Sequence, residues 1–151
     1  MAVNPKVLAV ASRGGHWIQL RRLAPALAAC DVVYASTDSA LRDDVPGERF
    51  VRVRDANRDE PWGCLVLFFQ ILRTLLSVRP DVVLSTGAAP GCLALVLGRA
   101  LGARTIWLDS IANVEQLSLS GRLVRAFAGL WLTQWPDLAH EQGPEFAGTV
   151  L

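Results

Sequence analysis

The sequence has little of the chemistry that marks metal and redox sites. It holds three cysteines, Cys30, Cys64 and Cys92, and two histidines among 151 residues, with no Cys-x-x-Cys pair and no Asp-x-Asp motif. This scarcity excludes a zinc ribbon and a disulfide framework, and it predicts that no metal is bound. We expect the cysteines to be reduced core residues of a cytosolic protein.

Charge and long hydrophobic runs are scarce as well. Charged residues make up 19% of the chain and the net charge is +1, so the sequence predicts no nucleic-acid partner. Apolar residues make up 52%, which suits one packed domain over residues 1–151. The longest apolar segment, residues 63–78, contains Gln70 and Arg73 and is shorter than the roughly 20 residues that span a bilayer. We expect no membrane-spanning helix.

Short apolar runs alternate along the chain with segments of helical periodicity. The runs predict strands over residues 6–11, 31–37, 48–54, 81–85, 104–108 and 130–133. We expect helices between them, over residues 16–29, 39–44, 62–78, 89–102 and 121–128. Pro25 predicts a kink in the first helix or a restart near Ala24. From residue 134 onward we expect loop and at most one helical turn.

This alternation predicts an α/β fold, a single Rossmann-like, doubly wound parallel sheet with helices on both faces. With the usual strand order 3-2-1-4-5-6, strands 1 and 4 are neighbours, and the loops after them face each other across one crevice. The first loop holds Gly14, Gly15 and His16, and strand 5 adds Asp109 and Ser110. The loop after strand 4 holds Ser85, Thr86, Gly87, Ala88 and Pro90. Both loops lead into helix N-termini, which favour a phosphate or diphosphate ligand.

Each of these features has a structural alternative. Gly14 and Gly15 also suit a tight turn without a ligand, and His16 also suits a helix cap, although its place at the crevice favours general-base catalysis. Asp109 also suits an N-cap. The apolar face of helix 62–78 is wider than one contact with a sheet needs. Packing in the core accounts for about half of this face, and the remainder is expected to meet a membrane or a partner. The residues expected on that surface are Trp62, Leu65, Phe68, Phe69 and Leu72.

Short motifs spread along the chain resemble one bacterial family. They are residues 12–16 followed by Gln19-Leu20, then residues 79–87, 117–123, 134–136 and 148–151. In this order they are similar to the PssD family, the capsular or exopolysaccharide relative of the fourteenth asparagine-linked-glycosylation subunit of eukaryotes. Two positions depart from the family pattern, since Asp109 stands in place of Glu and Asn113 in place of Arg.

The resemblance implies one half of a split, inverting glycosyltransferase with a MurG-like arrangement. This half supplies the acceptor side and attaches peripherally to the cytoplasmic face of the cell membrane. A PssE-like subunit binds most of the nucleotide sugar, which is a co-substrate, so no cofactor is expected. The expected acceptor is a saccharide linked to a polyprenyl diphosphate. Attachment to the membrane is expected through residues 62–78 or through a bound partner.

The candidate site residues and the rival functions follow from these loops. The expected catalytic residues are His16, as the general base on the attacking hydroxyl, and Asp109. The expected substrate-binding residues are Ser12, Gly14, Gly15, Ser85, Thr86, Gly87, Pro90 and Ser110. One rival is a non-catalytic scaffold that recruits the donor-binding subunit to the membrane. The other is a dinucleotide-binding oxidoreductase with Asp38 as ribose ligand, although the first turn lacks the three-glycine spacing of such enzymes.

Overall fold

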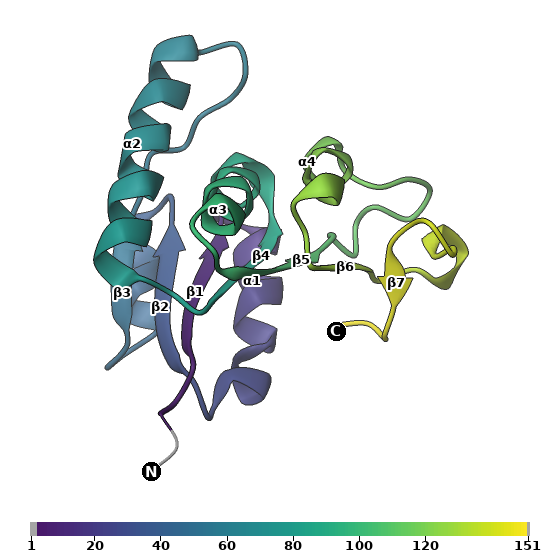
Figure 1. Cartoon of the computed structure of the whole chain (residues 1–151), viewed down its shortest axis with the longest axis horizontal. Helices are drawn as coiled ribbons and strands as arrows, with labels where there is room; N and C mark the ends of the chain where they lie inside the picture. Colours follow the sequence, from purple (N-terminus) through teal and green to yellow (C-terminus); the bar gives the residue numbers. More distant parts are fainter. Residues whose placement is uncertain (1–2, 151) are drawn as a thin grey trace.

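The structure, a computed structural model, describes residues 3–150 and contains a seven-stranded sheet flanked by helices (Figure 1). The strands are β1 Lys6–Ala11, β2 Asp31–Ser36, β3 Arg49–Arg52, β4 Val82–Gly87, β5 Arg104–Leu108, β6 Leu130–Thr133 and β7 Glu145–Phe146. The α-helices are α1 Gly15–Arg22, α2 Pro61–Val78, α3 Ala88–Ala100 and α4 Leu119–Leu123, and 3₁₀ helices span Ala24–Leu27, Ser39–Asp44, Val124–Ala126 and Pro136–Leu138. The ends of the expected domain, residues 1, 2 and 151, lie outside the described residues, as does the last residue of the closing motif.

All strand pairs in the sheet are parallel, and the strand order is β3-β2-β1-β4-β5-β6-β7. This order confirms the Rossmann-like fold and the expected arrangement of the first six strands. The expectation of loop after residue 134 is wrong at one place, because Glu145 and Phe146 form β7 beside Leu132 and Thr133. Both side chains of β7 are exposed, so no alternation of apolar residues marks this strand in the sequence.

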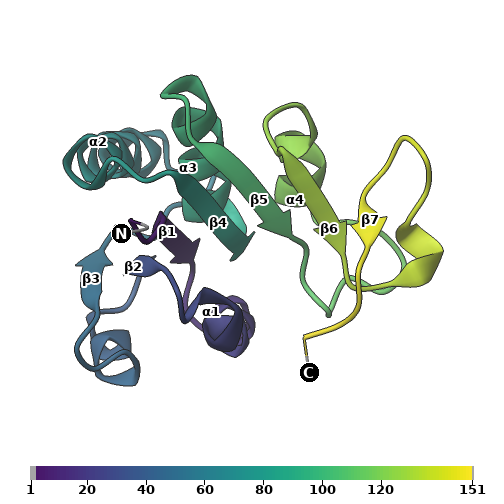
Figure 2. The ribbon, with the colours of Figure 1, turned by 60° about the horizontal axis from the view of Figure 1, so that its bottom comes forward.

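Helices cover the two faces of the sheet unequally. Figure 2 shows α2, α3 and α4 on one face and α1 on the other. Alternate strand residues supply the two cores, as the period of a β-strand requires: Leu8 and Val10 face α2 and α3, whereas Val7 and Ala9 face α1. The sheet edge at which the strands end is therefore bordered by helix N-termini from both faces.

Several element boundaries differ from those expected. The first helix ends at Arg22, and a 3₁₀ turn restarts at Ala24, which confirms the break expected at Pro25. Strand β4 continues to residue 87 rather than 85, and α3 begins at residue 88. The helix expected over 121–128 starts two residues earlier, because the Ser118 hydroxyl caps α4 by accepting a hydrogen bond from the Gly121 N–H.

Helix α2 is the one helix among the described residues that is long and apolar enough, by length and composition, to cross a membrane. This differs from the expectation drawn from residues 63–78. Four of its side chains nevertheless lie in the core on the α3 face of the sheet: Leu67, Ile71, Leu75 and Val78. The helix therefore contributes to the fold, and spanning a membrane would remove these side chains from the core.

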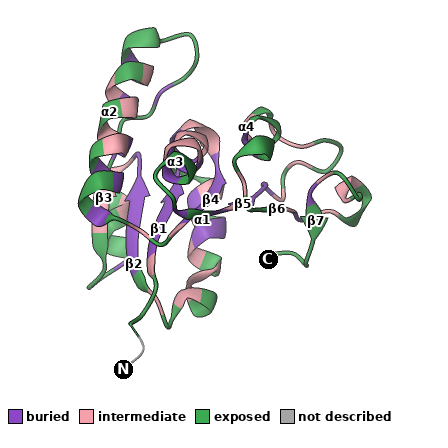
Figure 3. Cartoon of the chain, in the orientation of Figure 1, coloured by how far each residue is buried: buried purple, intermediate pink, exposed green. Residues whose placement is uncertain are grey.

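The outer side of α2 is the apolar surface expected from the sequence, with two differences. Trp62, Leu65 and Phe69 are 70%, 45% and 58% exposed, whereas Phe68 and Leu72 are half-buried. Figure 3 shows the exposed residues running along the length of the helix. Large apolar side chains gather rarely on one exposed face, so this face of α2 remains a candidate for a membrane or a partner.

Candidate functional site

The turn from β1 into α1 is made by glycine. Gly14 has a φ of 81°, a left-handed conformation that glycine adopts without steric cost, and its carbonyl accepts the hydrogen bond from the Ile18 N–H. No side chain among residues 3–150 caps α1, and its first turn contains no acidic residue. The N–H groups at this helix end are therefore available to an anion.

The turn from β4 into α3 faces it and is more strained. Gly87 has a φ of 147° and Ala88 a φ of 69°, so two consecutive residues have conformations that side chains disfavour. Helix α3, like α1, has no side-chain cap and no acidic residue in its first turn. The register of β1 on β4 shifts here, because Val10 pairs with Ser85 and Ala11 pairs with Gly87. Thr86 is thereby turned out of the ladder, as in a β-bulge.

Thr86 joins the two turns through a reciprocal pair of contacts with His16. Its hydroxyl donates a hydrogen bond to the His16 carbonyl at 2.6 Å, and its carbonyl lies 3.0 Å from Nδ1 of the His16 ring. A carbonyl oxygen only accepts hydrogen bonds, so Nδ1 carries the proton and donates it. In the neutral ring this leaves the lone pair on Nε2, which is the atom that can act as a base.

The His16 ring lies directly against Gly87. A Cβ atom built on Gly87 would come within 2.2 Å of His16 Nδ1, which no side chain tolerates. Glycine at residue 87 is thus required twice, by its backbone angle and by the ring beside it. The half-buried His16 is held in one orientation from both turns.

Asp109, at the end of β5, lies in a different setting. It is buried, and its two carboxylate oxygens accept four hydrogen bonds, from the indole of Trp107, the side-chain amide of Asn113, and the N–H and hydroxyl of Ser118. The two departures from the family pattern thus contact each other, since Asn113 donates to Asp109 at 3.0 Å. These contacts fold the loop between β5 and α4 around the carboxylate, and a catalytic role for Asp109 stays a prediction.

A buried amide network, for which the sequence analysis assigned no role, connects this loop to α1 and β6. Gln19 donates to the Ser110 hydroxyl and accepts from the Ile111 N–H, and Gln134 donates to both Gln19 and the Asp109 carbonyl. Gln134 also accepts the N–H of Val150 at 2.8 Å. Both glutamines belong to the motifs that carry the family resemblance, and that membership is the signal in the sequence that could have identified them. The two glutamines are 115 residues apart in the sequence, so no local sequence pattern predicts the hydrogen bond between them.

The expected substrate-binding residues divide into two layers. Gly14 and Gly15 are exposed, whereas Ser12, Thr86, Gly87, Pro90 and Ser110 are buried. Ser85 is fully buried, and its hydroxyl accepts the Gly87 N–H at 3.1 Å and fills the space beside Gly91. Direct binding of a ligand by the buried side chains stays a prediction. Among residues 3–150, no three His, Cys, Asp or Glu side chains gather as a metal site would require.

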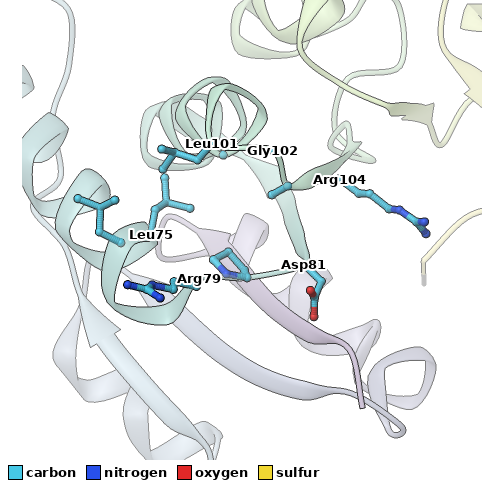
Figure 4. Close-up of a pocket in the computed structure, with 10 residues that line it drawn as sticks. Leu75, Arg79, Asp81, Leu101, Gly102 and Arg104 are labelled. Carbon is cyan, nitrogen blue, oxygen red and sulfur yellow. The ribbon is translucent and has the colours of Figure 1, made fainter. Parts of the chain in front are cut away.

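Another cavity, of about 660 Å³, lies at the opposite edge of the sheet. Figure 4 shows it between Leu75, Arg79, Asp81, Leu101 and Arg104, where β4 and β5 begin. Ligands of open parallel sheets bind at the edge where the strands end, so the topology favours the two facing turns at His16 over this cavity.

A comparison with known protein families gives the family of this chain. The family model described as "Oligosaccharide biosynthesis protein Alg14 like" matches residues 36–150. The chain belongs to the Alg14-like family. The matched residues include Gln134, the turn from β4 into α3, and the loop that surrounds Asp109.

Curated relatives of the Alg14-like chain are named as transferase subunits. The UDP-N-acetylglucosamine transferase subunit alg14 of Schizosaccharomyces pombe is 39% identical over 79 residues, which cover 47% of this chain and 37% of the relative. The subunit ALG14 of Mus musculus is 26% identical over 166 residues, which cover 88% of this chain and 76% of the relative. The similarity thus extends over most of the described sheet.

Solved structures share the fold of the Alg14-like chain. MurG of Acinetobacter baumannii superimposes with a TM-score of 0.80 at 16% identity, over 97% of this chain and 46% of that chain. A UDP-GlcNAc 2-epimerase of Neisseria meningitidis, bound to UDP-GlcNAc, has a TM-score of 0.67 at 13% identity, over 87% and 41% of the two chains. The Alg14-like chain therefore spans less than half the length of either protein.

Proposed function

We propose that the Alg14-like chain is the acceptor-side subunit, of PssD type, of a split and inverting glycosyltransferase. The enzyme transfers a sugar from a nucleotide sugar to a saccharide linked to a lipid diphosphate. The observation that carries the proposal is the orientation of His16, whose Nδ1 is engaged by Thr86. Within the described part of the chain, its Nε2 has no hydrogen-bond partner, and the two helix N-termini beside it have no side-chain cap. The names of the curated relatives favour UDP-N-acetylglucosamine as the donor.

The proposed reaction uses these groups in one displacement. The N–H groups at Gly14, Gly15 and the start of α3 bind the acceptor diphosphate, aided by the positive ends of the two helix dipoles. Nε2 of His16 takes the proton from the attacking hydroxyl as its oxygen bonds to the anomeric carbon. The bond from that carbon to the nucleotide diphosphate breaks with inversion, and the nucleoside diphosphate leaves with the bonding electron pair. Asp109 acts on the site through the loop that it holds in place.

The donor half of the site comes from a second subunit in this proposal. A PssE-like subunit binds most of the nucleotide sugar and completes the crevice, in keeping with relatives that are named as subunits. The exposed face of α2, with Trp62, Leu65 and Phe69, attaches the complex to the cytoplasmic surface of the cell membrane. Capsule or exopolysaccharide synthesis is the pathway class that the PssD resemblance favours.

The test compares His16→Asn with His16→Ala in the complex with the donor-binding subunit. Asparagine keeps an N–H near the place of Nδ1, so it holds the Thr86 carbonyl, but it has no atom in place of Nε2. We expect both variants to lose about 10²- to 10⁴-fold in kcat while the complex is retained. His16→Asn also keeps the wild-type thermal stability, whereas His16→Ala loses the contact with the Thr86 carbonyl and is somewhat less stable. His140→Asn, at the exposed second histidine, is the matched control and retains full activity.

Three outcomes contradict the proposal or parts of it. If His16→Asn keeps the wild-type kcat, His16 is not the base. If variants at Gly14, His16 and Gly87 all leave transfer intact while loss of the α2 surface abolishes it, the chain is a scaffold that recruits its partner and contributes no chemistry. Tight NAD binding by the chain would instead support an oxidoreductase.

A further inference from the structure

A large apolar groove lies between α2, α3 and α4. Its volume is about 940 Å³, within the range of about 300–1,000 Å³ that ligand sites occupy. Apolar side chains from all three helices form most of its wall, chiefly Leu65, Phe68, Cys92, Leu93, Val96 and Leu123. Arg58 is the one charged residue among those that line it in the described part of the chain. The groove therefore suits a hydrocarbon and offers few groups to a polar ligand.

The inner end of the groove adjoins the candidate site. Ala89 and Cys92 line it from the first two turns of α3, directly after the Gly87–Ala88 turn that contacts His16. A group bound by the N–H groups at the start of α3 thus lies beside the entrance to an apolar channel.

The outer end of the groove reaches the exposed apolar surface. Leu65 lines the groove and is also 45% exposed on α2, next to Trp62 and Phe69. On the opposite wall, Leu119 and Leu123 of α4 are 49% and 59% exposed. Figure 1 shows α3 between these two helices. The groove is thereby continuous from the anion-binding turn to the face of α2 proposed to meet the membrane.

Cys92, in the inner part of the groove wall, is half-buried. Burial raises the pKa of the Cys92 thiol above its ordinary value, since the low-dielectric surroundings disfavour the thiolate. Cys92 is also packed against the core cluster beneath α2 and α3. A thiol in this state is neutral at physiological pH and behaves as a small apolar group.

We propose that this groove binds the hydrocarbon chain of the lipid diphosphate, and runs it from the diphosphate at the α3 N-terminus out to the membrane-facing side of α2 and α4. This inference rests on the proposed function, because it takes the diphosphate as the group bound at the turns. A prenyl chain needs no hydrogen bonds and gains about fourfold in affinity for each methylene that is buried. In this proposal, α3 and α4 select the length of the hydrocarbon chain of the acceptor lipid.

The test measures binding rather than transfer, so it needs neither the acceptor sugar nor activity. The dissociation constants of inorganic diphosphate, geranyl diphosphate and farnesyl diphosphate are measured by calorimetry with the chain in complex with its donor-binding subunit. In the wild type we expect affinity to rise by about tenfold or more from inorganic diphosphate to geranyl diphosphate, and again to farnesyl diphosphate.

Val96→Trp fills the groove from α3, and Leu101→Trp places the same side chain at the residue directly after that helix, outside the groove. We expect Val96→Trp to abolish the gain with chain length and to keep the affinity for inorganic diphosphate, whereas Leu101→Trp behaves as the wild type. Leu123→Gln provides a second variant in the exposed α4 wall, where replacement leaves the core intact, and reduces the gain.

The outcomes separate this inference from the proposed function. Equal affinity of the wild type for all three compounds, or a chain-length gain that survives both groove variants, overturns the groove assignment and leaves the diphosphate site standing. Failure to bind even inorganic diphosphate removes the diphosphate site and the groove assignment with it. Loss of the partner subunit from Val96→Trp and from Leu123→Gln would identify the groove as a protein interface instead.

Discussion

Two loop systems meet at the edge where the strands end, and they are built by opposite means. The turns after β1 and β4 rely on backbone conformation, with glycines at positive φ and one reciprocal contact between His16 and Thr86. The loop after β5 relies on side chains, with four hydrogen bonds directed at the carboxylate of Asp109.

The two loop systems differ in the groups that remain available to a ligand. Around Asp109 the polar atoms satisfy each other, so that loop is rigid but has little left to offer a substrate. Around His16 the helix N-termini are uncapped, and the ring keeps Nε2 free. We infer that the β5 loop supports the crevice and that the two glycine turns bind within it.

Asp109→Ala is the substitution with the largest expected effect on stability. It leaves the buried Trp107 indole N–H and the Ser118 groups without their acceptor, and we expect the free energy of unfolding to fall by about 3 kcal/mol. Urea unfolding followed by tryptophan fluorescence measures the change. Asp137→Ala, at an exposed carboxylate, is the control and should be neutral.

The same variant tests the division between the two loop systems. A fully stable Asp109→Ala protein that has lost transfer activity would contradict the supporting role and favour the catalytic role expected from the sequence. If Asp109→Ala is destabilised but its folded fraction transfers the sugar at a normal rate, Asp109 supports the fold whereas His16 acts in the reaction.

Gly87→Ala is expected to act on the other system, with a smaller effect on stability and a specific effect on rate. The added Cβ would meet His16 Nδ1 at 2.2 Å and push the ring out of its orientation. We expect kcat to fall about 10- to 100-fold, since a displacement of the base by about 1 Å has effects of that size. Steady-state kinetics of the complex measure this.

Gly102→Ala is the matched control for backbone strain. Gly102 also has a positive φ, of 90°, but a Cβ there meets no atom within 4 Å. Both variants should lose about 1 kcal/mol of stability from the unfavourable φ, and Gly87→Ala should lose more because its Cβ also displaces the His16 ring. Gly87→Ala alone should lose activity. Equal kinetics for the two would mean that the contact between Gly87 and His16 does not position the base.

How far the sequence predicts this structure also divides along the two loop systems. The glycine turns follow from local signals, because apolar runs followed by Gly14 and Gly87 specify strand, turn and helix without reference to distant residues. The facing of the two turns then follows from the strand order of the fold class.

The β5 loop and the buried amides had no such signal. Asp109 meets partners two, four and nine residues away in an irregular loop, and Gln19 meets Gln134 across 115 residues. Hydrogen bonds of this kind depend on tertiary placement, which periodicity does not encode. Strand β7 was missed for a related reason, since its two exposed residues pair through the backbone alone.

Thr86→Val has the smallest expected effect and tests the link between the turns. Valine keeps the buried shape of Thr86 but removes the hydroxyl that donates to the His16 carbonyl, which lowers stability by about 1 kcal/mol. We expect kcat to fall by about two- to fivefold, with the rate equivalent of that energy as the upper bound, because the ring is still held at Nδ1 by the Thr86 carbonyl. Thr86→Ser retains the hydroxyl and should retain kcat. If Thr86→Val lost stability without any change in kcat, the hydroxyl contact would support the fold without orienting His16, and this part of the glycine turns would resemble the β5 loop after all.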